Sequence, residues 1–152
     1  MRTLLPLGLL AGLLLSGCST VSLKPGDFSW PVESVLKVDG KGTVEDARYS
    51  FSANVKELLF AETGDSVNVR GVTLRMIRDP RGFFYVTAPK FHAVYIFVQA
   101  DGALTMSRKV AVSEKGLAEP AFNLRSPNIQ LLRDKEPALL LNPDGIVEGG
   151  KK

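Results

Sequence analysis

Few side chains in this sequence have the types and spacing that chemistry requires. His92 is the only histidine, so it is the one side chain that titrates near neutral pH without help from its surroundings. A Ser-His-carboxylate hydrolase would use it as a base, but no serine lies in the sharp turn that exposes such a nucleophile. Ser107 with Lys109, and Ser113 with Lys115, bring a serine near a lysine, yet their surroundings are typical of a solvated strand face. We therefore expect no enzyme; the alternative is a small cell-envelope hydrolase whose site is assembled from scattered residues.

The sequence also lacks the groupings that hold metals, cofactors or nucleic acids. One cysteine and one histidine cannot form the ligand cluster of a structural zinc site. The acidic residues are scattered, without the alternating oxygen donors of a calcium loop, and no glycine-rich phosphate loop is present. Basic residues exceed acidic ones by only 19 to 16 and form no run, whereas nucleic-acid binding needs a clustered basic face. We expect no metal, no cofactor and no nucleic-acid partner.

Aromatic residues supply one candidate binding site. Half of the aromatic side chains fall between residues 83 and 97. In a barrel-like fold, the interior would be lined by Phe83, Phe84, Tyr85, Tyr95 and Phe97, which would suit a lipid or another apolar ligand. The alternative is that these rings simply fill the core, as side chains usually do in small barrels.

A second candidate surface is polar. Val67 and Val69 occupy odd positions, whereas Val72, Leu74 and Met76 occupy even ones, and the switch falls at Gly71. A β-bulge at this glycine would restore the inward face of a single strand. Arg70 and Arg75 would then both face outward, and we take them as a candidate surface for a protein partner.

The first eighteen residues carry the most specific signal. One positive charge at Arg2 precedes an apolar run over residues 4–15. As a helix this run would span only about 18 Å, at about 1.5 Å per residue, whereas a membrane-spanning helix needs about 20 apolar residues. The run is therefore typical of a signal peptide, and it ends in Leu15-Ser16-Gly17-Cys18. This motif resembles the lipobox of bacterial lipoproteins, so residues 1–18 are similar to those of a lipoprotein precursor.

The resemblance implies a covalent lipid anchor. In lipoproteins a signal peptidase recognises the positions matched here by Leu15, Ser16 and Gly17, and it cuts before the cysteine, which receives a diacylglycerol and usually a further acyl chain. Several acyl chains such as palmitate on Cys18 would give stable membrane attachment, whereas a single chain binds weakly. Serine after the cysteine, Ser19 here, implies sorting to the outer membrane of a two-membrane bacterium, with the domain facing the periplasm.

Composition divides the chain into four segments. We assign residues 1–17 to the signal peptide and residues 18–29, which contain Pro25 and Gly26, to a lipidated N-terminus and flexible tether. Residues 30–148 form a β-rich domain, and the glycine- and lysine-rich residues 149–152 form a flexible tail.

The domain has the frequent turn sequences that are typical of a β protein. Turn sequences such as Asp79-Pro80-Arg81-Gly82 and Asp101-Gly102 separate short apolar runs. Residues 49–55 alternate between apolar and polar, as a half-buried strand does, although Asn54 with Glu57 could instead begin a single helical turn. Residues 91–98 are almost continuously apolar, which predicts a strand buried on both faces.

The prolines after Gly116 allow only short edge strands around residues 129–132 and 138–141. We therefore predict an all-β fold: one small β-sandwich or barrel-like domain of about seven short antiparallel strands, with at most one short helical turn.

Together these observations predict a membrane-anchored bacterial lipoprotein on the periplasmic face of the outer membrane. By elimination, its β-rich domain would be a non-enzymatic binding or envelope-assembly module that contacts an envelope protein whose identity the sequence does not reveal. The alternatives are the small hydrolase described above and a carrier of an apolar ligand.

Overall fold

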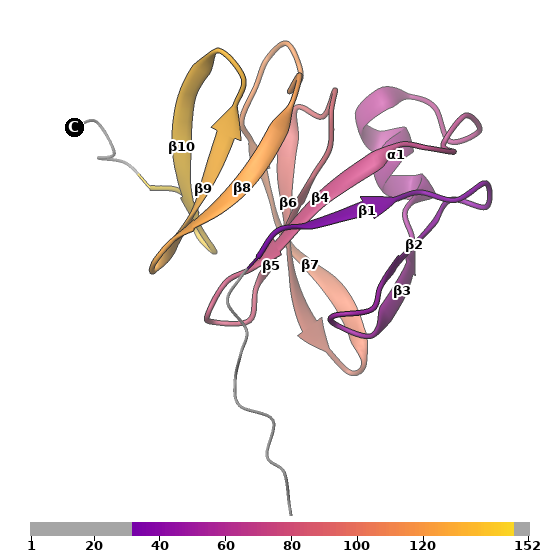
Figure 1. Cartoon of the computed structure of the whole chain (residues 1–152), viewed down its shortest axis with the longest axis horizontal. Coiled ribbons are helices and arrows are strands. Elements are labelled where there is room, and N and C mark those ends of the chain that lie inside the picture. Colours follow the sequence, from indigo (N-terminus) through magenta and orange to yellow (C-terminus); the bar gives the residue numbers. More distant parts are fainter. Residues whose placement is uncertain (1–31, 148–152) are drawn as a thin grey trace, which may run out of the picture.

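A computed structural model describes residues 32–147 of the chain. The expectations for the signal peptide, Cys18, the tether and the tail lie outside the described residues. Within them, eleven antiparallel strands and a single short helix confirm the all-β class. Figure 1 shows three groups of elements side by side: C-terminal strands, a central sheet, and a hairpin with the helix.

The central layer is a sheet of five strands in the order β1-β4-β5-β6-β7. Its strands are β1 (Ser34–Lys37), β4 (Thr73–Arg78), β5 (Phe84–Thr87), β6 (Ala93–Ala100) and β7 (Ala103–Ala111). The β6–β7 hairpin turns at the predicted Asp-Gly pair, where both residues have positive φ angles of 50° and 77°. Because these angles match the favoured two-residue hairpin turn, this local prediction is confirmed.

The second layer is a four-stranded sheet built from the C-terminal quarter of the domain, in the order β11-β10-β9-β8. Its strands are β8 (Pro120–Arg125), β9 (Asn128–Arg133), β10 (Glu136–Asn142) and β11 (Gly145–Ile146). Our prediction of only short edge strands here was wrong, and so was the total of about seven strands. The prolines are accommodated because they fall at the start of a strand, in turns or beside a bulge in β10, and so remove few ladder hydrogen bonds.

The third layer consists of the hairpin β2 (Thr43–Asp46) and β3 (Phe51–Asn54), followed by the helix α1 (Lys56–Thr63). Strand β3 alternates half-buried and exposed residues, as predicted. The helix is longer than the single predicted turn, and it ends at Gly64, whose φ of 71° and N–H donated to the Phe60 carbonyl are typical of a glycine C-cap. Asn54 accepts a hydrogen bond from the Lys56 N–H at its start.

The predicted bulge at Gly71 is wrong. Residues 64–72 form a loop, and strand β4 begins only at Thr73. Gly71 lies in a turn with a φ of 82°, and its N–H donates to the Val38 carbonyl at 3.0 Å. The change of apolar register therefore separates a loop from a strand. An irregular register occurs instead between β6 and β7, where Ile96 pairs with Arg108 but Phe97 pairs with Met106.

Two hydrophobic cores lie on opposite faces of the central sheet. Leu74, Phe84 and Tyr95 point to the core shared with the β2–β3 hairpin and α1. Tyr85 and Ile96 point to the other core, which the four-stranded sheet covers. All four residues of β5 are buried, so the predicted two-sided burial is present in β5 as well as in the first half of β6.

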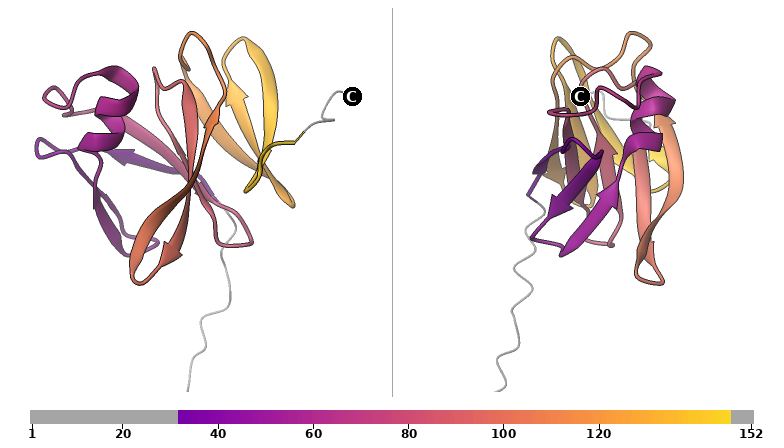
Figure 2. Two further views of the ribbon diagram at one scale, coloured as in Figure 1. Left: turned by 180° about the vertical axis from the view of Figure 1, so that it is seen from behind. Right: turned by 90° about the vertical axis from the view of Figure 1, so that its right-hand side faces the viewer.

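The described sheets do not close into a barrel. Strand β2 lies beside β1 but forms a separate two-stranded sheet with β3, so the central sheet ends at β1 on one side and at β7 on the other. Neither β3 nor β7 pairs with a further strand in the described part of the chain. The tips of the β2–β3 and β6–β7 hairpins extend toward the same side of the molecule in Figures 1 and 2.

Candidate functional site

An apolar pocket of about 410 Å³ lies in the core between the central sheet, the β2–β3 hairpin and α1. Ligand pockets in proteins usually measure about 300–1,000 Å³ and are lined mainly by apolar side chains. Apart from Asn54, Glu57 and the Tyr95 hydroxyl, the lining residues are apolar: Leu36, Val44, Phe51, Ala53, Val55, Leu58, Ala61, Leu74, Met76, Val86, Phe97, Leu104 and Met106. The described fold therefore holds an apolar cleft of ligand size.

The floor and the mouth of this pocket differ in exposure. Leu74 and Met76 on β4 form a floor and are each only 1% exposed. Asn54 and Glu57 are exposed at the β3–α1 junction, and Met106 on β7 is 55% exposed. The mouth therefore lies between β3 and α1 on one side and β7 on the other, where both sheets end. We call this gap the seam.

The aromatic residues proposed as a ligand lining do not share one face. Tyr95 and Phe97 line the pocket. Tyr85 is fully buried in the opposite core, with Phe83 packed against that core. The reason is the two-residue period of strands: Tyr95 pairs with Val86, so the neighbouring Tyr85 must point the other way. The expectation of one common lining is therefore corrected to Tyr95 and Phe97.

A buried carboxylate lies next to the pocket. The Glu62 side chain, on the last turn of α1, is 1% exposed. Its Oε1 accepts a hydrogen bond from the Tyr95 hydroxyl at 2.6 Å and lies 2.8 Å from Lys109 Nζ. Its Oε2 accepts the His92 backbone N–H at 2.6 Å and lies 3.5 Å from His92 Nδ1. We call these four residues the Glu62 cluster.

The electrostatics of the Glu62 cluster favour the charged carboxylate. Burial raises the pKa of Glu62, but hydrogen bonds from Lys109, Tyr95 and the His92 N–H outweigh it and hold the pKa below the ordinary value of 4.5. The hydrogen bond to Glu62 raises the pKa of Lys109. Burial, together with the hydrogen bond to Glu62, raises the pKa of Tyr95. At neutral pH the cluster therefore holds an ion pair between the buried Glu62 carboxylate and the half-exposed Lys109 ammonium, beside a neutral tyrosine.

His92 and Glu62 also line a second, more polar cleft of about 700 Å³ on the other side of α1, together with Lys115. A carboxylate beside a histidine supplies two of the three members of a hydrolytic triad. Within residues 32–147, however, no serine hydroxyl donates a hydrogen bond to His92. Ser113 contacts His92 only through its backbone N–H, which donates to the His92 carbonyl at 3.2 Å. Within the described residues, the arrangement therefore lacks the serine nucleophile of a triad.

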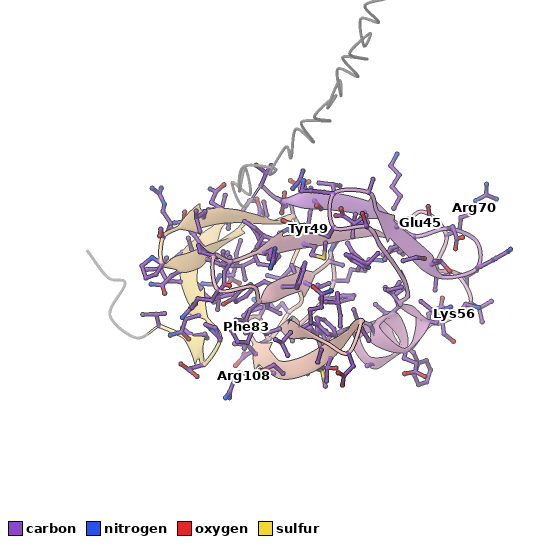
Figure 3. All side chains as sticks on the ribbon, turned by 90° about the horizontal axis from the view of Figure 1, so that it is seen from below. Glu45, Tyr49, Lys56, Arg70, Phe83 and Arg108 are labelled. Carbon is purple, nitrogen blue, oxygen red and sulfur yellow. The ribbon has the colours of Figure 1, made fainter. Side chains whose placement is uncertain are left out.

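The two arginines proposed as a partner surface have different environments. Arg75 Nη1 lies 3.0 Å from the Glu33 carboxylate, and the arginine side chain is 31% exposed. Glu33 also accepts the Phe122 N–H at 2.8 Å, so this ion pair joins the central sheet to β8. Arg70 is exposed in the loop before β4, and Figure 3 shows it pointing outward at one end of the molecule. Arg75 is thus largely occupied within the domain.

Sequence reasoning did not identify Glu62 as a functional residue. It lies in Glu62-Thr63-Gly64-Asp65, which has the composition of a turn, and its partners come from two distant strands. Only a helix ending at Gly64 would have placed Glu62 on a face toward β6 and β7. No helical periodicity in residues 56–63 predicts that helix.

No three histidine, cysteine or acidic side chains among residues 32–147 converge to hold a metal ion. The helix of the described domain is far too short to cross a bilayer, and no membrane-spanning helix was found there. Comparisons with protein-family models, with curated proteins and with solved structures gave no match.

Proposed function

We propose that the protein is a lipid-anchored binding module whose β domain holds an apolar ligand, such as an acyl chain, in the pocket beside α1. The observation that carries this proposal is an apolar cleft of about 410 Å³ that opens to solvent at its mouth. Clefts of this size with a mainly apolar lining are the usual sites of small-molecule binding, so it calls for an occupant.

The apolar lining of the pocket favours a ligand with an apolar chain. A ligand in contact with Leu74, Met76 and Phe97 would bury apolar surface, which stabilises binding by about 25 cal/mol per Å². The polar lining groups Asn54 and Glu57 are exposed at the mouth, where a ligand's polar end would remain in water. The pocket therefore fits a molecule with one long apolar part and one polar end.

The N-terminal sequence supports a location beside such ligands. The lipobox-like sequence around Cys18 supports its lipidation. Val32, the first described residue of the domain, is the fourteenth residue after Cys18. Fourteen residues extend at most about 50 Å, at about 3.3–3.6 Å per residue. A domain on this tether would work within a few nanometres of a lipid bilayer, and the outer membrane facing the periplasm remains our proposed location.

The experiment is a titration with cis-parinaric acid, a fatty acid whose fluorescence rises in apolar surroundings. The chain from Cys18 onward would be used with Cys18→Ser, so that no attached acyl chain competes, because both cores lie within the described domain. Saturable binding is expected. Ala53→Phe, which fills the pocket from β3, should weaken binding by at least about tenfold, or about 1.4 kcal/mol.

The matched control is Ala121→Phe, a half-buried alanine on β8 that does not line the pocket. It should bind the fatty acid like the parent chain. Failure of the parent chain to bind, or equal binding by the Ala53→Phe variant, would contradict the proposed function.

A further inference from the structure

We propose that the Glu62 cluster is a latch that holds the mouth of the apolar pocket narrow, and that its release lets the ligand enter and leave. The proposal rests on the proposed function in that it takes the occupant to be an apolar ligand. It assigns to Glu62 and Lys109 a role in controlling access.

The position of the ion pair carries the argument. The seam is bordered by β3 and α1 on one side and by β7 on the other, and Met106 stands exposed in it. Among the hydrogen bonds and ion pairs of residues 32–147, the 2.8 Å contact of Glu62 Oε1 with Lys109 Nζ is the one that joins α1 directly to β7. This pair closes one end of the seam, and no strand pairing closes the rest.

The helix on which Glu62 lies has few other attachments. It is eight residues long, has no side-chain hydrogen bond at its N-cap, and buries only Leu59 completely. Helices shorter than about 12–15 residues are marginal without tertiary contacts. Elements with few buried contacts open at lower free-energy cost than the core of a domain. The hold of the Glu62 carboxylate on β6 and β7 is therefore a large part of what keeps α1 in place.

Tyr95 couples the latch to the pocket. Its ring lines the apolar pocket, while its hydroxyl donates to Glu62 Oε1 at 2.6 Å. Lys109 Nζ lies 5.1 Å from the centre of the same ring, within the range of a cation–π interaction. A ligand that displaces the Tyr95 ring must therefore disturb the Glu62 cluster, and loss of the cluster frees the ring.

The test measures rates as well as affinity. Association and dissociation of cis-parinaric acid would be followed by stopped-flow fluorescence for the parent chain with Cys18→Ser and for two latch variants, Glu62→Gln and Lys109→Met. Lys109 is 48% exposed, so its replacement removes the ion pair with little change in packing and serves if the Glu62 variant folds poorly. Both rates are expected to rise by at least about fivefold in each variant, while the affinity changes little.

The matched control is Glu33→Gln. Glu33 also forms an ion pair, 3.0 Å from Arg75, and accepts a backbone N–H, but it lies on the face of the sheet opposite the pocket. Its replacement should lower the melting temperature without changing either rate. Unchanged rates in both latch variants would overturn the proposal and leave Glu62 a purely structural residue.

Hydrogen exchange separates failure of the latch from failure of the proposed function. If the parent chain binds no fatty acid, the proposed function falls, yet the latch still predicts faster amide exchange in α1 of both latch variants than in the parent chain. Equal protection of α1 in the parent chain and both variants would show that the Glu62 cluster does not hold the helix, whatever the pocket binds.

Discussion

At the scale of single residues, two buried carboxylates show what a sequence can and cannot reveal. Asp79 is 3% exposed and accepts the N–H groups of Arg81 and Phe83 and the Tyr85 hydroxyl, so all of these partners lie within six residues along the chain. Its Asp-Pro-Arg-Gly sequence predicted the turn that begins at Asp79. Glu62 is buried equally well, but its partners are 30 to 47 residues away. Only the assembled fold brings these groups together, so no local pattern could identify them.

The Glu62 cluster predicts a pH dependence of stability. Because its hydrogen bonds hold the pKa of folded Glu62 below 4.5, the carboxylate stabilises the fold fully above the pKa of the unfolded chain. That contribution is lost as the pH falls below about 4.5 and through the lower pKa of the folded state. Three titratable groups face Glu62: His92, Tyr95 and Lys109. The pKa values of Tyr95 and Lys109 are raised, so both keep their protons in this acid range. Urea denaturation at a series of pH values would measure the effect.

The Glu62→Gln variant isolates this contribution, because Asp39 and Asp65, whose pKa values are also lowered by backbone N–H groups, remain in both chains. The variant should be less stable at neutral pH, and its free energy of unfolding should fall less steeply between neutral pH and pH 3. Parallel curves for the two chains would contradict the assignment.

At the scale of elements, Gly116 lies where the loop before β8 contacts the loop around Lys90. Gly116 has a φ of 80°, and a Cβ there would lie 2.9 Å from the Lys90 carbonyl oxygen. The surrounding backbone is paired, since the Lys90 N–H donates to the Leu117 carbonyl. Gly116→Ala therefore combines an unfavourable backbone conformation, which costs about 1–2 kcal/mol, with a clash against main chain. We expect it to lower the free energy of unfolding by at least about 1 kcal/mol more than the backbone term alone.

Gly102→Ala is the matched control, because its φ is 77° but a Cβ there would meet nothing within 4 Å. Urea denaturation of the two variants, with unchanged m-values, measures the difference. Equal losses of stability would show that the loop around Lys90 shifts to accept the extra methyl group.

The elements also show where sequence patterns suffice. Alternation in β3, the two-sided burial of β6 and the hairpin turn at Asp101 were predictable because each depends on a few neighbouring residues. The four-stranded C-terminal sheet was not, because prolines predict interrupted strands, whereas here the turns and strand starts accommodate them. The loop around Gly71 and the separation of Tyr85 from Tyr95 depend on which strands pair, and that information is not local.

At the scale of the whole molecule, lipidation of Cys18 is the property most open to direct test. Cells expressing the full chain and fed an alkyne-labelled palmitate should yield labelled protein in the membrane fraction. Cys18→Ser should abolish the label, because the thiol that receives the lipid is gone. Labelling or stable membrane attachment of that variant would contradict the lipoprotein assignment.

Ser19→Asp is the companion variant. It keeps the thiol, so it should be labelled as strongly as the parent chain. If the host has two membranes, density-gradient separation should find it in the inner-membrane fraction and the parent chain in the outer-membrane fraction. Co-migration of the two chains would leave the lipid anchor intact and remove the proposed sorting by Ser19.

The fully buried strand β5 has a consequence for the energetics of the whole domain. Phe84 and Val86 belong to the core that contains the pocket, and Tyr85 belongs to the core covered by the C-terminal sheet. Unfolding of either half alone would expose β5 residues that pack in the core of the other half. The two halves should therefore unfold in a single cooperative transition. By thermodynamic linkage, a ligand in the pocket would then raise the melting temperature of β8–β11, strands that it never touches.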